Sequence, residues 1–296
     1  MEYKLSNQYN IYKFSKENPV ALYVDSGSTI CIETMDCFAN QIQSETDVLE
    51  NIDLERVNPA TGPIYVRDAY PGDILKVSIE DITVNKKGVM LTGKNLGVLG
   101  EELTDTHLKI VPIIDDKIIF NSNIKIPVNP MIGVIGVAPE IGECYCGVSG
   151  PHGGNMDNTM ISVGSTLYLP IFVEGALFAL GDLHAAMGDG EIGVSGVEVA
   201  GSVKVKLEVI KGFRLRNPLL ENNEFFSTIA SSKNLDSAVE LAIKDMAEFL
   251  KERMNLPLHE IVMLMSALGS TQICKVIEPT RAARFLMPRW IIGDLF

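Results

Sequence analysis

The chain has 296 residues, of which 46% are hydrophobic and 21% are charged, and its formal net charge is −13. This composition is typical of a globular protein with a full hydrophobic core. The negative charge argues against nucleic acid as a partner, because phosphates would be repelled. We expect no secretory leader, because the first residues show no basic, apolar pattern, and no membrane partner, because no apolar run is long enough to span a bilayer. The five cysteines then indicate free thiols in a cytoplasmic protein.

Short strands dominate the chain as far as Ile210. Residues 21–25 and 29–34 alternate between apolar and polar positions and predict a β-hairpin around Ser26-Gly27-Ser28. Residues 202–210 alternate strictly and predict another strand. Many short strands between Gly/Pro turns, with little helical periodicity, are typical of a β-sandwich or barrel-like domain. We place this β-rich catalytic domain at residues 1–217.

Residues 218–296 follow a different pattern. Apolar residues at helical spacing predict a helix over 234–253, with Asn234 as its N-cap. A second helix is predicted over 257–269, and Pro279 is expected to begin a short last helix. The predicted fold is therefore mainly β, with a smaller C-terminal α/β part that packs on the β-rich domain.

The most unusual stretch runs from Val173 to Glu191. Its apolar run, Ala176 to Leu180, ends in Asp182-Leu183-His184, and Asp189-Gly190-Glu191 comes soon after. In an extended chain, residues two apart point to the same face. We therefore expect Asp182 and His184 to converge, and Asp189 and Glu191 as well if that piece is extended. A carboxylate and a neutral imidazole suit a divalent metal, zinc in particular. The alternative is an ordinary turn, in which Asp and Gly are common.

Two other stretches offer polar donors. His152-Gly153-Gly154-Asn155 contains adjacent glycines, which fit a place where backbone must approach a ligand. His152, Asn155 and Asp157 would supply one nitrogen and two oxygen donors there, although a plain loop is the alternative. Asp36 follows a predicted strand, either as a strand-end carboxylate or as a turn aspartate.

These stretches resemble the acetamidase/formamidase family of amide hydrolases. The segments that carry the resemblance occur in family order at 34–38, 58–63, 71–73, 151–157 and 175–191. The resemblance implies a mainly-β protein with a smaller α/β part that hydrolyses formamide or acetamide to the acid and ammonia. Met187 stands where the family often has a polar residue, so the resemblance indicates the reaction class more firmly than the amide.

The motifs and the resemblance together assign a metal site with Asp36, His152, Asp182 and His184 as ligands. The expected ion is divalent, zinc by preference, because it lowers the pKa of its water and polarises a carbonyl oxygen. Three further residues are candidate catalytic groups: Glu191, Asp189 and Asn155. Either acid could move a proton from water to the departing ammonia or help to bind a second, oxygen-preferring ion such as calcium. Asn155 could orient the amide.

Two rival functions stay open. Cys144-Tyr145-Cys146 lies just upstream of His152, so a cysteine-nucleophile amidase is one alternative. A non-catalytic β-sandwich that binds calcium and a ligand is the other. We also expect a homodimer, because of the family resemblance and because the closing segment from Phe285 to Phe296 is too apolar for a free end.

Overall fold

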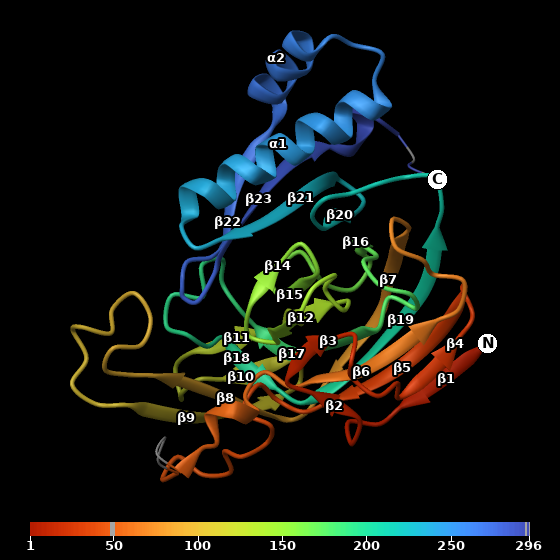
Figure 1. The fold of residues 1–296 in the computed structure, drawn as a ribbon. Helices are drawn as coiled ribbons and strands as arrows, with labels where there is room; N and C mark the ends of the chain where they lie inside the picture. The colour runs from red at the N-terminus through yellow and green to blue at the C-terminus, as the bar shows by residue number, and fades with distance from the viewer. Residues whose placement is uncertain (48–50, 294, 296) are drawn as a thin grey trace.

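The computed structural model describes residues 1–47, 51–293 and 295, so Phe296 of the closing segment lies outside the described residues. Strands form a far larger share of the molecule than helices do, and the two α-helices lie together in its C-terminal part (Figure 1). The prediction of a mainly-β protein is confirmed.

The first sheet contains nine strands from both halves of the chain. Its order is β1 (Glu2–Leu5), β5 (Ser28–Thr34), β19 (Gly201–Ile210), β7 (Ile74–Val84), β16 (Thr166–Pro170), β20 (Leu219–Glu221), β21 (Phe225–Ser232), β23 (Arg281–Pro288) and β22 (Ser270–Lys275). Because β16 pairs with β20, the C-terminal strands extend the same sheet. The domain boundary predicted at residue 217 therefore falls in the loop between β19 and β20, across which the sheet is continuous.

The second sheet contains twelve strands. Nine of them run in the order β11 (Lys125–Pro127), β10 (Lys117–Ile119), β9 (His107–Ile114), β8 (Lys87–Thr92), β18 (Val197–Val199), β17 (Phe178–Ala186), β12 (Met131–Gly136), β15 (Gly153–Asn155) and β14 (Ser149–Gly150). Off this path, β6 (Ala60–Val66) pairs with β17 and with β2 (Asn10–Ile11) and β4 (Leu22–Val24). A separate pair joins β3 (Lys13–Ser15) to β13 (Glu143–Tyr145).

The largest hydrophobic core includes side chains from both sheets. Ile32 of β5 and Val205 of β19 belong to it, as do Ile132 of β12 and Leu183 of β17. Burial of this apolar surface at roughly 25 cal/mol per Å² is the main force that holds the two sheets together. Strand β17 is buried along nearly its whole length, so polar side chains on it are shielded from water.

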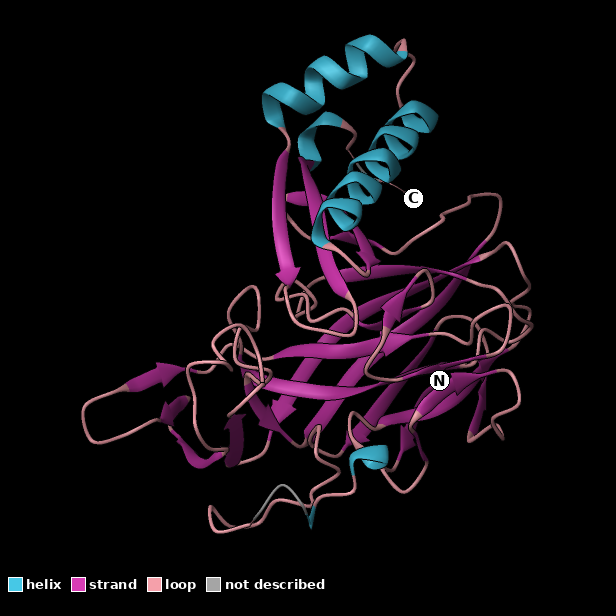
Figure 2. Ribbon diagram, turned by 60° about the vertical axis from the view of Figure 1, so that its left-hand side comes forward, coloured by secondary structure: helices cyan, strands magenta, loops and turns pink. Residues whose placement is uncertain are grey.

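The helices pack on the C-terminal strands. Helix α1 (Leu235–Arg253) contacts β21 and β23, and α2 (Leu258–Leu268) follows it (Figure 2). Asn234 caps α1 as predicted, because its side chain accepts a hydrogen bond from the Ser237 N–H at 2.8 Å. A second core of apolar side chains fills the space between α1 and these strands. In the described part of the chain, neither helix combines the length and the apolarity that a membrane span requires.

Two predictions about individual elements are wrong. Strands β4 and β5 exist but form no hairpin, because β4 pairs in parallel with β6 whereas β5 pairs with β1 and β19. No helix begins at Pro279, where the chain leads instead into β23. The run Ala282–Met287 is buried on both faces of the sheet and lies between β21 and β22.

Candidate functional site

Strand β17 brings Asp182 and His184 to one place. Gly133 of the neighbouring strand β12 lies next to both side chains. A Cβ added to Gly133 would lie 2.7 Å from Asp182 Oδ2 and 2.9 Å from His184 Cε1. The prediction that the two side chains converge is therefore confirmed, and Gly133 leaves the space that they occupy.

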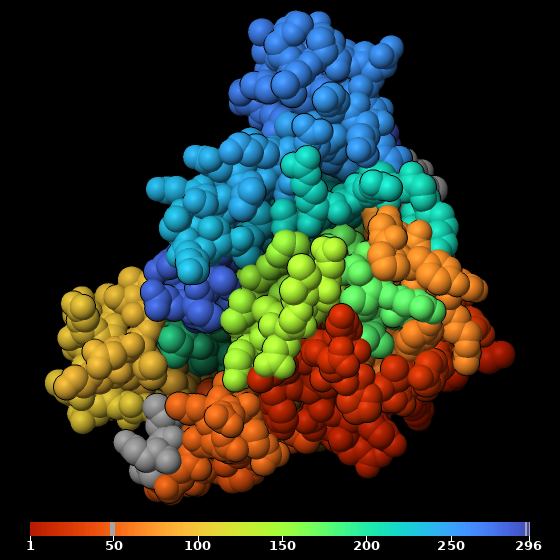
Figure 3. All heavy atoms as spheres, viewed as in Figure 1, coloured from red at the N-terminus to blue at the C-terminus, as the bar shows by residue number. Residues whose placement is uncertain are grey.

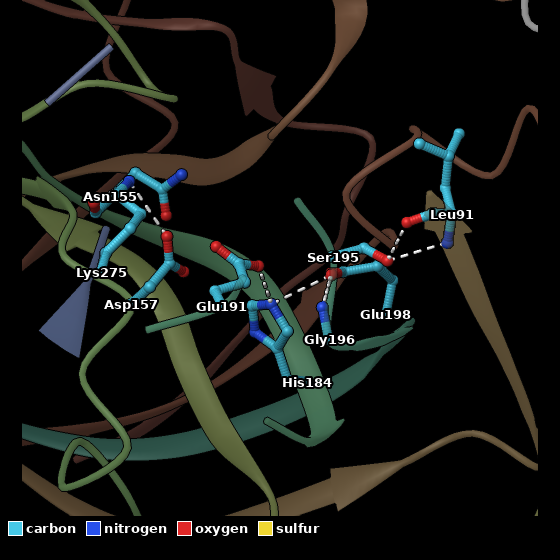
Figure 4. A network of polar contacts seen from close by, with 9 residues as sticks. All are labelled: Leu91, Asn155, Asp157, His184, Glu191, Ser195, Gly196, Glu198 and Lys275. Atoms are coloured by element: carbon cyan, nitrogen blue, oxygen red, sulfur yellow. Dashed lines mark hydrogen bonds and ion pairs between the residues drawn. The ribbon is translucent and has the colours of Figure 1, made fainter. Parts of the chain in front are cut away.

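Two glutamates surround the imidazole of His184. Its Nε2 lies 3.0 Å from Glu198 Oε1 and 3.2 Å from Glu191 Oε1 (Figure 4). Glu198 comes from β18, beside β17, and Glu191 comes from the loop that follows β17. Burial acts to lower the pKa of His184, but the charge of Glu198 and the hydrogen bonds that the imidazole donates to both glutamates outweigh burial and hold that pKa well above its usual value.

The site contains more buried carboxylates than cations. Asp157, Asp182, Glu191 and Glu198 are each less than 10% exposed. Burial and the charge of Glu198 raise the pKa of Asp182 well above its usual value. Burial and the charge of Asp157 raise the pKa of Glu191 to about 8. Without a bound ion, the site therefore holds excess negative charge that is buried away from water. Its desolvation destabilises the folded state unless a cation or bound protons compensate the charge.

Several polar atoms in this cluster lack hydrogen-bond partners. Asp157 Oδ1, Asp182 Oδ1, Glu198 Oε2 and His184 Nδ1 are all buried without one. Most buried polar groups in proteins are satisfied, so a group of unsatisfied ones needs an explanation. A ligand that all these atoms contact would explain why they have no hydrogen-bond partner within the protein.

Three of the carboxylate residues have left-handed backbone. The φ angles are 42° for Asp157, 56° for Asp182 and 45° for Glu191. Such conformations cost on the order of 1–3 kcal/mol each outside glycine and are concentrated at functional sites. The surrounding strands hold these residues in strained positions that aim their side chains inward.

The donors fall into two groups that could hold a metal ion. Among the described residues, the ligand atoms of Asp157, His184 and Glu191 lie within 4.8 Å of one another, and so do those of Cys37, Asp182 and Glu198. Carboxylate oxygens with an imidazole nitrogen are ligands that zinc accepts, and oxygen-rich sets also suit calcium. The residues present therefore fit a divalent cation.

The other two predicted ligands lie outside both groups. Asp36 Oδ1 accepts hydrogen bonds from the backbone N–H groups of Phe38 and Asn40, at 3.0 and 2.7 Å, as a turn aspartate does. His152 packs edge-on against Phe14, and its Nε2 is buried without a partner. Burial lowers the pKa of His152 to about 4, so its imidazole is neutral. The assignment of Asp36 and His152 as ligands stays a prediction.

Asp189 and Glu191 point to different partners rather than to a shared one. Glu191 faces His184, whereas both oxygens of Asp189 contact the Arg284 guanidinium at 2.6 and 3.2 Å. The loop is not extended here, so the condition for their convergence fails. Because its oxygens are held by Arg284, Asp189 anchors the loop that carries Glu191.

A cavity of about 520 Å³ opens beside the acidic cluster. Asn155, Asp182, Glu191 and Glu198 line its polar side. Its apolar wall consists of Leu54, Val57, Val148, Val194, Ile277 and Pro279. Asn155 Oδ1 is buried without a hydrogen-bond partner, so the amide side chain is available to a ligand.

Sequence reasoning missed three residues of the site. Glu198 lies between Val197 and Val199 in a strand. An acid with apolar neighbours on both sides was the signal in the sequence that could have indicated a buried carboxylate. Lys275 and Gly133 gave no local signal, since their importance depends on which residues the fold places beside them.

Comparisons with known proteins match this chain to acetamidases and formamidases. The model of the Acetamidase/Formamidase family matches residues 3–142 and 148–289. The structure of a predicted acetamidase/formamidase from Thermoanaerobacter tengcongensis is 54% identical, covers 100% of this chain and 99% of that one, and has a TM-score of 0.98. An acetamidase from Bacillus halodurans is 45% identical, covers 98% and 100%, and has a TM-score of 0.96.

The chain spans less than two thirds of the length of the curated relatives that it matches. The formamidase of Methylophilus methylotrophus is 25% identical over 270 aligned residues, and the match covers 69% of this chain and 65% of that protein. A relative from Schizosaccharomyces pombe is 28% identical over 259 residues, and the chain spans 62% of its length.

Proposed function

Because the chain belongs to the acetamidase/formamidase family, we propose that it hydrolyses a small aliphatic amide, formamide or acetamide, to the carboxylate and ammonia. The observation that carries the proposal is the acidic cluster around His184, which lies at the cavity inside the region matched by the family model. Formamide and acetamide are neutral and unreactive. A catalyst must therefore supply a nucleophilic water and stabilise the negative charge on the carbonyl oxygen.

The proposal includes a divalent cation, zinc by preference. Asp182 and His184 would hold it, with Asp157 beside His184 and Glu198 beside Asp182 as the remaining acidic donors. The unpartnered oxygens and the excess of buried negative charge support this assignment. When bound, such an ion lowers the pKa of water and polarises a carbonyl. The number of acids leaves ligands for a second, oxygen-preferring ion such as calcium.

Glu191 is the proposed proton carrier. Its carboxylate lies at the cavity wall, and its raised pKa suits a group that takes a proton from water and returns it to the leaving nitrogen. Asn155 would orient the substrate, because its amide offers one acceptor and two donor hydrogens that complement those of another amide. Asp189 would act indirectly, through the loop that it anchors to Arg284.

The cysteine mechanism has less support. Cys146 is fully buried, and burial raises its pKa. Burial also raises the pKa of Cys144, and that of Cys37 at the cavity lies well above its usual value. A thiol nucleophile must ionise easily, and these environments oppose ionisation. Family membership weighs against a binding module without activity.

Ammonia release from formamide and acetamide tests the proposal. The purified protein is assayed as isolated, after chelator dialysis and after zinc is restored, with metal content measured on each sample. We expect turnover that the chelator abolishes and zinc restores. Turnover that persists without metal but is lost with a thiol-alkylating reagent would indicate the cysteine mechanism. No turnover on any amide would indicate the binding module.

A further inference from the structure

Lys275 is a lysine that the fold has buried completely. It ends β22, whose earlier residues are mostly exposed, whereas Cys274 and Lys275 are 0% and 1% exposed. The pairing of β22 with β23 shifts register between Ile273 and Lys275, so Cys274 is an extra residue in the strand. Such bulges turn a side chain to the other face and are common beside active sites. Here the bulge sends Lys275 inward.

The segment around Lys275 is fixed against the loop that carries Glu191. The backbones of Lys275 and Gly190 form a parallel β-bridge. The Gly190 N–H donates a hydrogen bond to Cys274 O at 2.8 Å, and the Val276 N–H donates one to Gly190 O at 3.0 Å. Figure 3 shows the deep-blue segment that follows β22 lying against the green and teal surface of the β-rich part. The backbone that carries the ammonium is therefore as firmly placed as that of Glu191.

The ammonium reaches the cavity beside Asn155. Lys275 Nζ donates to Asn155 O at 2.7 Å and lies 3.0 Å from Asp157 Oδ2 (Figure 4). An ammonium has three N–H donors, so these two contacts do not use all of them. Among the described residues that line the cavity, Lys275 is the one with a basic side chain, and the rest are apolar, amide, thiol, phenol or acidic.

We propose that Lys275 is a catalytic residue that donates a hydrogen bond to the oxyanion formed during amide hydrolysis. The inference rests on the proposed hydrolysis at this site. Negative charge on the substrate oxygen would be repelled by the four acids, so a fixed donor of opposite charge is needed next to it. A preorganised donor in a place shielded from water stabilises such a charge far more than water does.

The step balances without any other reactant. The oxygen of water forms a bond to the carbonyl carbon while one of its protons passes to Glu191. The π electrons move to the carbonyl oxygen, which becomes the oxyanion and accepts the N–H of Lys275. When the oxyanion collapses, the C–N bond breaks and the nitrogen receives the proton from Glu191, so that the carboxylic acid and ammonia are released. Lys275 keeps all its protons throughout.

Two substitutions test the role. Lys275→Met keeps much of the side-chain volume but removes the donor, and Lys275→Gln keeps a neutral donor for the contacts with Asn155 and Asp157, which protects folding. We expect each folded variant to lose about 100- to 1,000-fold in kcat, the usual effect of removing an oxyanion donor. This includes Lys275→Gln, because the two N–H groups of its amide would be used by the contacts with Asn155 and Asp157 and none would be left for the oxyanion. KM should change less than about threefold, because the neutral ground-state amide bears little charge on its oxygen.

Two measurements and a control variant separate this role from a structural one. Zinc content and the circular dichroism spectrum should match those of the parent, and Lys206→Met, on a surface lysine that pairs with Glu208, should retain full kcat. A folded Lys275 variant with kcat within threefold of the parent would overturn the inference, even while the parent hydrolyses amides. A parent protein that releases no ammonia would instead contradict the proposed amide hydrolysis itself. The activity of the parent therefore distinguishes failure of the proposed function from failure of the role of Lys275.

Discussion

The β-rich part and the C-terminal part contribute opposite charges to the same site. The four buried acids come from residues 157–198, whereas Lys275 and Arg284 come from β22 and β23. Lys275 lies 3.0 Å from Asp157, and Arg284 lies 2.6 Å from Asp189. The C-terminal strands are therefore more than an appendage, because they supply positively charged side chains that pair with these acids. The predictions below test each side of this division.

The largest effect is expected on the acidic side, from His184→Ala. We expect ammonia release to fall by at least about 10³-fold and bound zinc to drop sharply, because the imidazole is the central nitrogen donor of the cluster. The circular dichroism spectrum should keep its β signature. Metal stoichiometry, circular dichroism and activity are measured on one preparation. A folded variant with full metal and full rate would remove His184 from the site.

The next effect compares two acids of one loop. Glu191→Gln should lower kcat by about 10²- to 10⁴-fold, because it removes the group that carries the proton. Asp189→Asn should lower kcat less than about tenfold, because Asp189 contacts Arg284 and acts only through the loop. Both variants are assayed at saturating amide. Equal losses in the two variants would contradict the division of roles.

Metal removal should make stability depend on pH. Glu191 has a folded pKa of about 8 against a usual 4.5, so between these values the folded state holds a proton that the unfolded chain has released. Stability of the metal-free protein should therefore fall as pH rises from about 4.5 to 8. The raised pKa of His184 acts in the same direction.

Urea unfolding midpoints at several pH values, with chelator and with zinc, measure this effect. Zinc should flatten the dependence, because a bound cation replaces the protons as the compensating charge. A metal-free protein that becomes more stable toward pH 8 would contradict the assignment of excess buried negative charge.

On the cationic side, Arg284→Met should cost stability more than rate. Arg284 is 4% exposed and hydrogen-bonds Asn158, Gln272 and Asp189. Losing charged hydrogen bonds of this kind costs about 1.5–3 kcal/mol, and the partly exposed Asp189 recovers some hydration. Urea unfolding at saturating zinc gives the free energy. Unchanged stability would mean that the anchor is not needed.

The smallest effect on catalysis is expected from loss of the proposed homodimer. Phe285, Leu286 and Met287 of the closing segment are buried within β23, but Trp290 is 74% exposed. Trp290→Glu should lower the mass seen by light scattering at micromolar concentration from that of a dimer to about one chain, with little change in kcat. A monomeric parent protein would refute the dimer.

Local pattern alone was sufficient for several parts of this protein. Helix α1 was predictable from its apolar spacing and its Asn234 cap, since both are interactions within about four residues. The convergence of Asp182 with His184 was predictable for the same reason, because the period of a strand sets which side chains share a face. The motif around them also pointed to the family that the comparisons identify.

Pairing between distant segments was beyond such reasoning. The alternation of β4 and β5 predicts strands but says nothing of their partners, and β4 in fact joins β6 while β5 joins β1 and β19. Glu198 and Lys275 reach the site from 14 and 91 residues beyond His184 in the numbering. Lys275 points inward because β22 has a bulge against β23, and a one-residue change of register reverses the face of every side chain after it. Side-chain direction over short distances follows from backbone geometry, whereas contact over long distances depends on how the two sheets and the C-terminal strands pack.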